Sequence, residues 1–462
     1  MTTNTSRRAF LQRASALSVA GAATPWVLNL AALGEAAAAT ATDYKALVCI
    51  FLYGGNDYAN TLIPYDTANY NAYAAMRPPL AYAQTDLAAT ALTPLASPPG
   101  GALPSGRQYA LAPELAPLLT HFNAGKLGVM LNVGTLVQPT SKLQYTNNSA
   151  PLPPKLFSHN DQQSVWQSSA PEGAASGWGG RMGDLYAAGN GNATFTCVNV
   201  SGNAVFLSGK TAVQYQVTPT GPVALAGAQS TLFGSSACAA ALKTLVTATR
   251  TDVFESEYNR VMTRSLSAGA QLTAALAAGP TIATVFPTAN ALGDQLKLVA
   301  RMISNAAAIG AKRQVFFVSI GGFDTHSSLN AVHPGLMTTV ADAMSAFYQA
   351  TVELGVANSV TAFTASDFGR TATGNDGSDH GWGSMHFMLG GAVNGGRFYG
   401  TAPAVANNGP DDVGQGRLLP STSVDQYAAT LGSWFGISNA DLLTVLPNLA
   451  NWNATQRNLG FV

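Results

Sequence analysis

The sequence is poor in charge. Only 10% of its 462 residues are Asp, Glu, Lys or Arg, whereas about 25% is usual for a soluble domain. Basic and acidic residues are equal in number, 23 of each, so the formal net charge is +0. Lys and Arg form no cluster beyond the first residues, which argues against electrostatic binding to nucleic acid or to anionic lipid. A small neutral-to-anionic ligand held at a local site fits this composition better.

Cysteine is also scarce. Three residues, Cys49, Cys197 and Cys238, exclude a dense disulfide framework. One bridge between Cys197 and Cys238 can form in an oxidising compartment, whereas Cys49 lies inside an apolar run and is expected to pack in the core. No two cysteines have the spacing that is typical of metal ligands.

The start of the chain has the order of an export signal. The arginine pair Arg7 and Arg8 precedes a moderately apolar run over residues 16–33 and small residues at 36–39. This order is typical of a twin-arginine signal peptide, which we expect over residues 1–39. A membrane anchor is the alternative, but glycine, threonine and proline interrupt the run and an Ala-rich stretch ends it. The sequence therefore predicts a periplasmic or secreted protein with no stable membrane span after removal of the signal.

Several apolar runs are continuous rather than alternating. They cover residues 47–53, 127–133, 315–320 and 360–365. Continuous hydrophobicity is typical of strands covered on both faces, as in parallel α/β sheets. Helical patterns precede three of these runs, over residues 113–122, 292–309 and 334–354. The alternation of helix and strand predicts an α/β fold with a mostly parallel sheet flanked by helices, in a single domain over residues 40–462.

Other segments differ from this pattern. Residues 187–230 contain short strand-like pieces between glycine turns, and we expect a small β-rich insertion or cap there. Residues 236–277 are Ala-rich and helical in pattern. Residues 374–400 are rich in glycine and are expected to form an ordered loop at the site. The spacing of Ser423 and Gln426 predicts a capping box at the start of an amphipathic helix.

Three of the predicted strands end in a carboxylate. Asp57 follows the first strand, Asp324 follows the strand that ends at Ile320, and Asp367 follows the strand that ends at Ala365. Ligands of parallel sheets bind outside the carboxyl ends of the strands. We therefore expect a metal or anion site at this edge of the sheet.

Most of the histidines fall in the same segments. Four of the six belong to this group, namely His159, His326, His380 and His386. Mixed sets of Asp and His suit one or two divalent ions such as zinc or manganese. For any single carboxylate a turn or capping role is the alternative, but ionisable residues gathered at one edge are costly to bury without partners. Such ions could polarise a phosphoryl or sulfuryl oxygen and activate a serine or a water.

Two further residues are candidates for chemistry. Ser158 precedes a probable helix and is interpreted either as an ordinary N-cap or as a nucleophile at the positive end of that helix, beside His159 and Asp161. Arg370 follows Asp367 by three residues and could offer a fork of donors to a tetrahedral anion. An ordinary surface or structural ion pair is the alternative for Arg370.

Five motifs carry a resemblance to a known family. In chain order they are the twin-arginine start, FSHNDQQ, GGFDTH, SDFGRT and DHGWG. Together they resemble the bacterial family labelled domain of unknown function fifteen-hundred-and-one, over essentially the whole mature chain. That family is grouped with the alkaline-phosphatase and sulfatase superfamily, whose metal-dependent members hydrolyse phosphate and sulfate esters. The resemblance implies an alkaline-phosphatase-like α/β fold.

The resemblance also implies roles for individual residues. It places Ser158 at about the position of the superfamily nucleophile, and it implies metal ligands at Asp57, Asp324, His326, Asp367 and His380. Three features depart from the superfamily pattern. The sulfatase signature Cys/Ser-x-Pro-x-Arg is absent, Phe368 stands where many of its phosphatases have His, and Asp324 and His326 are closer together than in alkaline phosphatase. These departures concern the number of metal ions and the identity of the nucleophile.

The expected function follows from these features. We expect a metal-dependent hydrolase of phosphate or sulfate esters that acts on a small anionic ester. The alternative is a non-catalytic binding or assembly protein that keeps the fold with a degenerate site. The sequence identifies no protein partner.

Overall fold

A large central sheet organises the molecule. The computed structural model describes residues 41–95 and 103–462, so the expected signal peptide lies outside the described residues. The sheet has ten strands. Nine follow one another in space in the order β13 (Arg397–Gly400), β4 (Leu127–Gly134), β12 (Ser384–Gly390), β9 (Val360–Ser366), β1 (Lys45–Leu52), β8 (Arg313–Ile320), β5 (Cys197–Asn199), β6 (Tyr215–Thr218) and β7 (Gly221–Pro222), while β14 (Thr422–Ser423) pairs with β4.

Most neighbouring strands run parallel. The strand β1 is parallel to both β8 and β9, and β5 continues the parallel arrangement beyond β8. The strand β12 is antiparallel to both of its neighbours, β4 and β9. These pairings confirm the predicted mostly parallel sheet.

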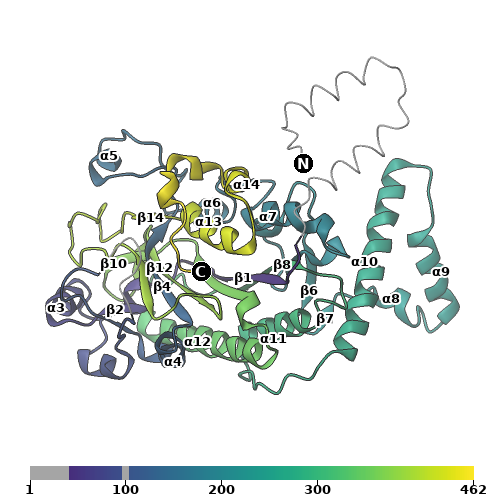
Figure 1. Cartoon of the computed structure of the whole chain (residues 1–462), viewed down its shortest axis with the longest axis horizontal. Helices are drawn as coiled ribbons and strands as arrows, with labels where there is room; N and C mark the ends of the chain where they lie inside the picture. Colours follow the sequence, from purple (N-terminus) through teal and green to yellow (C-terminus); the bar gives the residue numbers. More distant parts are fainter. Residues whose placement is uncertain (1–40, 96–102) are drawn as a thin grey trace, which may run out of the picture.

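Helices cover both faces of the sheet (Figure 1). Val48 and Ile50 of β1 belong to the core under α4 (Ala116–Asn123), α11 (Ala291–Ser304) and α12 (Leu329–Glu353). Leu47 and Phe51 belong to the opposite core, under α7 (Trp178–Tyr186) and α13 (Val424–Phe435). Because successive side chains of a strand point to opposite faces, a strand between two helical layers must be apolar at every position. This explains the continuous apolar run of β1.

The remaining elements surround this frame. Two short hairpins lie outside the main sheet, one from β2 (Leu62–Pro64) with β3 (Tyr109–Leu111) and one from β10 (Arg370–Gly374) with β11 (Ser378–His380). In Figure 1, α9 (Ser236–Thr247) and α10 (Val253–Ala278) project at the end of the sheet nearest β6 and β7. The other helices are α3 (Thr67–Met76), α5 (Lys142–Thr146), α6 (His159–Ser168), α8 (Ala226–Gln229) and α14 (Asn439–Val445).

Two segments differ in detail from the sequence expectations. Residues 187–230 supply β5, β6 and β7, and these short strands extend the edge of the main sheet. The prediction of a loop over residues 374–400 is wrong in part, because β12 in this stretch is a fully buried strand inside the sheet. The predicted capping box of Ser423 and Gln426 is present at the start of α13.

The three cysteines all lie within the described residues and are free thiols. Cys197 is buried and Cys238 is exposed, and both are free thiols, so the bridge considered above is absent from the structure. Cys49 is buried in the core, as expected. Within residues 41–95 and 103–462, the structure contains no helix of sufficient length and hydrophobicity to span a membrane.

Candidate metal centre

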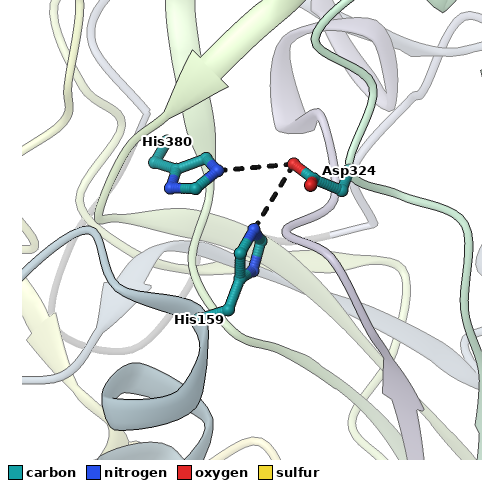
Figure 2. Close-up of side chains that lie close together, drawn as sticks. All are labelled: His159, Asp324 and His380. Carbon is teal, nitrogen blue, oxygen red and sulfur yellow. Dashed lines mark ion pairs between the residues drawn. The ribbon is translucent and has the colours of Figure 1, made fainter.

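Three elements bring His159, Asp324 and His380 together at the carboxyl end of the sheet (Figure 2). His159 is the first residue of α6, Asp324 follows β8, and His380 ends β11. The Asp324 Oδ1 atom lies 3.4 Å from His159 Nε2 and 3.4 Å from His380 Nε2. His326, from the same segment as Asp324, places its Nε2 atom 3.0 Å from the same oxygen. Three imidazole nitrogens thus surround one carboxylate oxygen.

The register of the central strands explains why these segments meet. Leu52 of β1 lies beside Ile320 of β8 and Ser366 of β9, so the three strands end at the same level. Gly54 then adopts a φ of +114°, and a Cβ there would collide with the backbone of Asp324. A glycine is needed at this position because other residues rarely adopt such a φ and have no room for a side chain.

Hydrogen bonds fix the orientation of two of the imidazole rings. His159 Nδ1 lies 2.6 Å from Asp367 Oδ2, and His380 Nδ1 lies 2.7 Å from the Phe157 carbonyl oxygen. Since a carboxylate and a carbonyl only accept, both rings donate through Nδ1. In the neutral ring, Nε2 then carries the lone pair. The Nε2 atom of His159 faces Asp324, whereas that of His380 lies 3.4 Å from Asp324 Oδ1 and 2.9 Å from His326 Nε2.

This arrangement fits a divalent ion. His159 Nε2 is a buried atom without a hydrogen-bond partner among the described residues, and it faces the Asp324 carboxylate. An acceptor nitrogen aimed at a carboxylate is unfavourable unless a proton or a cation lies between them. A histidine held through Nδ1 by a carboxylate while Nε2 binds a metal is the usual arrangement in metal sites. The donor set of His and Asp suits zinc or manganese.

Asp367 bonds to Nδ1 of the His159 ring, whereas Asp324 lies at the other ring nitrogen, Nε2. Its carboxylate is buried and accepts from Gln163 Nε2 at 2.8 Å, from the Gly54 amide at 3.2 Å and from His159. Asp367 therefore supports the His159 ring. It contacts the cluster through His159, whereas the sequence motif implies that it is a ligand itself.

Arg370 is buried beneath the site. Its guanidinium donates to Asp324 Oδ1 at 2.9 Å and to the Gly54 carbonyl at 2.9 Å, and its side chain is 0% exposed. The Ser378 carbonyl accepts from its remaining nitrogens. In this structure all these bonds are made within the chain, so Arg370 orients Asp324 and does not reach the surface.

The charges of the site shift its acid–base equilibria. Burial acts to raise the pKa of Asp324, but the hydrogen bond and charge of Arg370 outweigh it and lower the pKa below its usual range. The hydrogen bond to Asp367 raises the pKa of His159. Burial lowers the pKa of His380. At pH 7 these shifts favour the ionised form of Asp324 and the neutral form of His380, which are the forms able to bind a metal, whereas the shift of His159 favours its protonated form.

Asp57 lies apart from this cluster. Its carboxylate is buried and accepts from Arg77 Nη2 at 2.8 Å, from Ser378 Oγ at 2.7 Å and from the Asn60 amide at 3.0 Å. Burial acts to raise the pKa of Asp57, but the charge of Arg77 is among the causes that lower it overall. The structure therefore brings Asp57 to the sheet edge but engages it in an internal ion pair.

Ser158 occupies the N-cap position of α6, directly before His159. Its side chain makes no capping bond to the helix backbone. Instead, Ser158 Oγ donates to Asp161 Oδ2 at 3.0 Å, and Asp161 is buried. The simple capping interpretation therefore does not describe this serine.

An open groove adjoins the cluster. It has a volume of about 500 Å³, and its lining includes His326 and Asp379. All of the other lining residues are neutral, namely Thr371, Thr373, Gly374, Asn375, Gly377, Ser378 and Gln415. The groove gives a small molecule access to one side of the cluster.

Sequence reasoning missed two residues of this region. The sequence places His159 among the histidines of the expected site but leaves it out of the five predicted ligands, although its place at a helix start near strand-end carboxylates is a usable signal. Arg77 gave no signal, because it ends a helix, α3, that carries no motif. His386 lies elsewhere, buried on β12, and burial lowers its pKa to about 3.

A family match covers most of the described chain. The sequence profile of the family described as "Protein of unknown function (DUF1501)" matches residues 44–446. The chain belongs to this family. Among curated proteins, none matches the sequence of this DUF1501 protein at a significant level.

Solved structures that are similar to the DUF1501 protein include three that are distant from it in sequence. Ps i-CgsB, solved in complex with k-i-k-neocarrahexaose, has 8% identity and a TM-score of 0.35, with 90% of this chain and 78% of the other covered. A protein of Bacteroides thetaiotaomicron, reported with the metabolism of multiple glycosaminoglycans, has 10% identity and a TM-score of 0.33, with coverage of 86% and 74%. A sulfatase from Pseudoalteromonas sp. has 10% identity and a TM-score of 0.31, with coverage of 86% and 68%.

Proposed function

We propose that this protein is an extracytoplasmic hydrolase of phosphate or sulfate esters that depends on a divalent metal ion. The ligands in this proposal are His159, Asp324, His326 and His380. The observation that carries the proposal is the position of three imidazole Nε2 atoms 3.0 to 3.4 Å from one oxygen of Asp324. A divalent ion bound there would supply Lewis-acid polarisation of an ester oxygen.

The chain's own groups support this chemistry by holding the ligands. Asp367 keeps His159 in the tautomer with a free Nε2, and Arg370 holds Asp324 from below. Such supporting bonds keep ligands oriented and tune their basicity. The open groove beside His326 receives the organic part of the ester in this proposal.

Ser158 is the nucleophile in this proposal. Its hydroxyl donates to Asp161 Oδ2 at 3.0 Å, so this carboxylate is placed to accept the proton as Ser158 Oγ bonds to the phosphorus or sulfur atom. The bond from that atom to the ester oxygen breaks, and the organic group takes up a proton and leaves as an alcohol. Water then hydrolyses the seryl phosphate or sulfate and restores the serine. The free amides at the start of α6 favour negative charge at the same place. Because His159 is the next residue in the chain, the backbone of Ser158 lies beside the cluster.

Metal content and turnover test the proposal. Wild-type protein purified without chelator should contain a divalent metal and should hydrolyse an aryl phosphate or aryl sulfate in the presence of zinc, manganese, magnesium or calcium. Asp324→Asn and His159→Gln should lose both the metal and the activity, because each removes a ligand. Asp86→Asn, an exposed carboxylate on another element, is the matched control and should keep both.

The outcomes separate the two functions considered. A metal-free wild type after reconstitution with each ion would contradict the site. A wild type that binds metal but cleaves none of the esters would select the alternative, a non-catalytic binding or assembly protein. The buried position of Arg370 favours that alternative in one respect, since its guanidinium is 0% exposed and bonds to Asp324, Gly54 and Ser378 of the same chain.

A further inference from the structure

The pair of Asp57 and Arg77 is almost completely withdrawn from solvent. Their side chains are 1% and 0% exposed, and Arg77 Nη2 lies 2.8 Å from Asp57 Oδ2. Asp57 stands at the end of β1, the strand next to the one that leads to Asp324. Arg77 reaches this point from the end of α3. A fixed positive charge thus stands beside the strand-end carboxylate.

Both oxygens of the Asp57 carboxylate also accept hydrogen bonds from neighbouring groups. Oδ2 accepts from Ser378 Oγ at 2.7 Å and Oδ1 accepts from the Asn60 amide at 3.0 Å. His333 lies nearby and bonds to Asn56, but burial lowers its pKa to about 4, so it is neutral at pH 7. Arg77 therefore supplies the positive charge that balances Asp57.

The charges around the histidine cluster bear on how many divalent ions can bind there. Three carboxylates, Asp324, Asp367 and Asp379, stand against two guanidinium groups, Arg370 and Arg417. One divalent ion is enough to balance and exceed the remaining negative charge. A second ion, at the overlapping group of His326, Asp379 and His380, would have to share His380 with the first. It would also leave a large excess of positive charge in a partly buried region, which is costly.

We infer that this edge of the sheet takes a single divalent ion, at His159, Asp324, His326 and His380, and that the Arg77 guanidinium permanently fills the cation position beside Asp57. This inference rests on the proposed function and adds the metal count to it. The internal pair is also connected to the site, since Ser378 bonds to Asp57 through Oγ and accepts from Arg370 through its carbonyl. The pair acts as a structural substitute for a second ion.

Metal stoichiometry tests the inference directly. Elemental analysis of the full mature chain and calorimetric titration of the metal-stripped chain with zinc should both give one ion per chain. The double variant Asp57→Asn/Arg77→Met removes both charges and keeps similar side-chain volumes, so it avoids an unpaired buried charge. It should still bind one ion, with an affinity within about twofold of wild type, as expected for a site without shared ligands. His159→Gln should bind none.

Each result has a definite meaning. Two ions in wild type, or the loss of an ion in the double variant, would overturn the inference while the proposed function stands. No ion in any form would overturn both. If the double variant does not fold, as judged by circular dichroism, Asp57→Asn serves as the second variant beside the wild-type stoichiometry. The single amide oxygen of Asn can keep either the bond from Ser378 or the bond from Asn60.

Discussion

His159 and Asp367 show how a buried charge can be retained for chemistry. Asp367 is 1% exposed, and an isolated carboxylate at such a place would be strongly unfavourable. Bonds from His159, Gln163 and the Gly54 amide compensate for the lost hydration. The same bonds fix the His159 ring, so the stability of the strand end and the orientation of the ligand depend on one another.

Ser158→Ala separates a nucleophile from a structural serine. The serine makes no capping bond, so its loss should cost less than the roughly 1 kcal/mol typical of a cap. Turnover of the best aryl ester should be abolished, while metal content and fold stay intact. These quantities are measured by steady-state kinetics, elemental analysis and thermal unfolding.

Ser141→Ala is the matched control for that variant. Ser141 caps α5 in a complete capping box, so its replacement should destabilise the helix without a change in kcat. If Ser158→Ala turns over the ester at a near-normal rate, Ser158 is not the nucleophile.

At the residue scale, the sequence predicts those site residues that have a recognisable position next to a strand or within a motif. Asp324 and His326 follow a predicted strand and His380 lies in a motif loop, and the structure places all three together. Arg77 could not be found in this way. Its pairing with Asp57 depends on how α3 folds back over the strand end, and no local pattern determines that contact.

At the scale of elements, runs that are apolar throughout were easy to recognise. The strands β1, β4, β8 and β9 lie where the sequence predicts them because burial on both faces requires such runs. The strand β12 was missed, since the glycines around Ser384–Gly390 suggested a loop. Several of these glycines instead allow close approach of backbones, as at Gly383 and Gly390, where a Cβ would collide with neighbours.

The helix α13 contains a buried carboxylate that makes stability depend on pH. Burial raises the pKa of Asp425 to about 6, and Ser169 Oγ donates to it at 3.4 Å. The folded state therefore holds a proton that the unfolded state releases near its ordinary pKa. As the pH rises from about 4 to 6, the folded state loses stability relative to the unfolded state, by about 3 kcal/mol for a shift of this size.

Asp425→Asn should remove this dependence. The variant stays neutral at all pH values, so its free energy of unfolding should exceed that of wild type by about 3 kcal/mol more at pH 7 than at pH 4. Denaturant unfolding at a series of pH values measures the difference, with Asp86→Asn as the exposed control. A gap between variant and wild type that does not change with pH would refute the assignment.

At the scale of the whole molecule, the extracytoplasmic localisation of the protein is a prediction from its first residues. Replacement of Arg7 and Arg8 by lysine should stop export by the twin-arginine route, since the arginine pair is the recognised feature. Cell fractionation and immunoblotting should then find the precursor retained inside the cell. Arg13→Lys, outside the pair, should be exported normally. Equal export of the double-lysine variant would show that another route is used.

The order of strands in space determines when the chain can fold during synthesis. The strand β1 lies between β8 and β9, and β4 pairs with β12, β13 and β14. The ribosome therefore synthesises β1 and β4 long before the strands with which they pair. Contacts between such distant segments form slowly. A nascent chain that has not yet reached Val360 therefore carries the apolar β1 without one of its neighbours, and it is prone to aggregate unless a chaperone shields it. Assembly of the sheet centre is thus an event that follows translation of most of the chain.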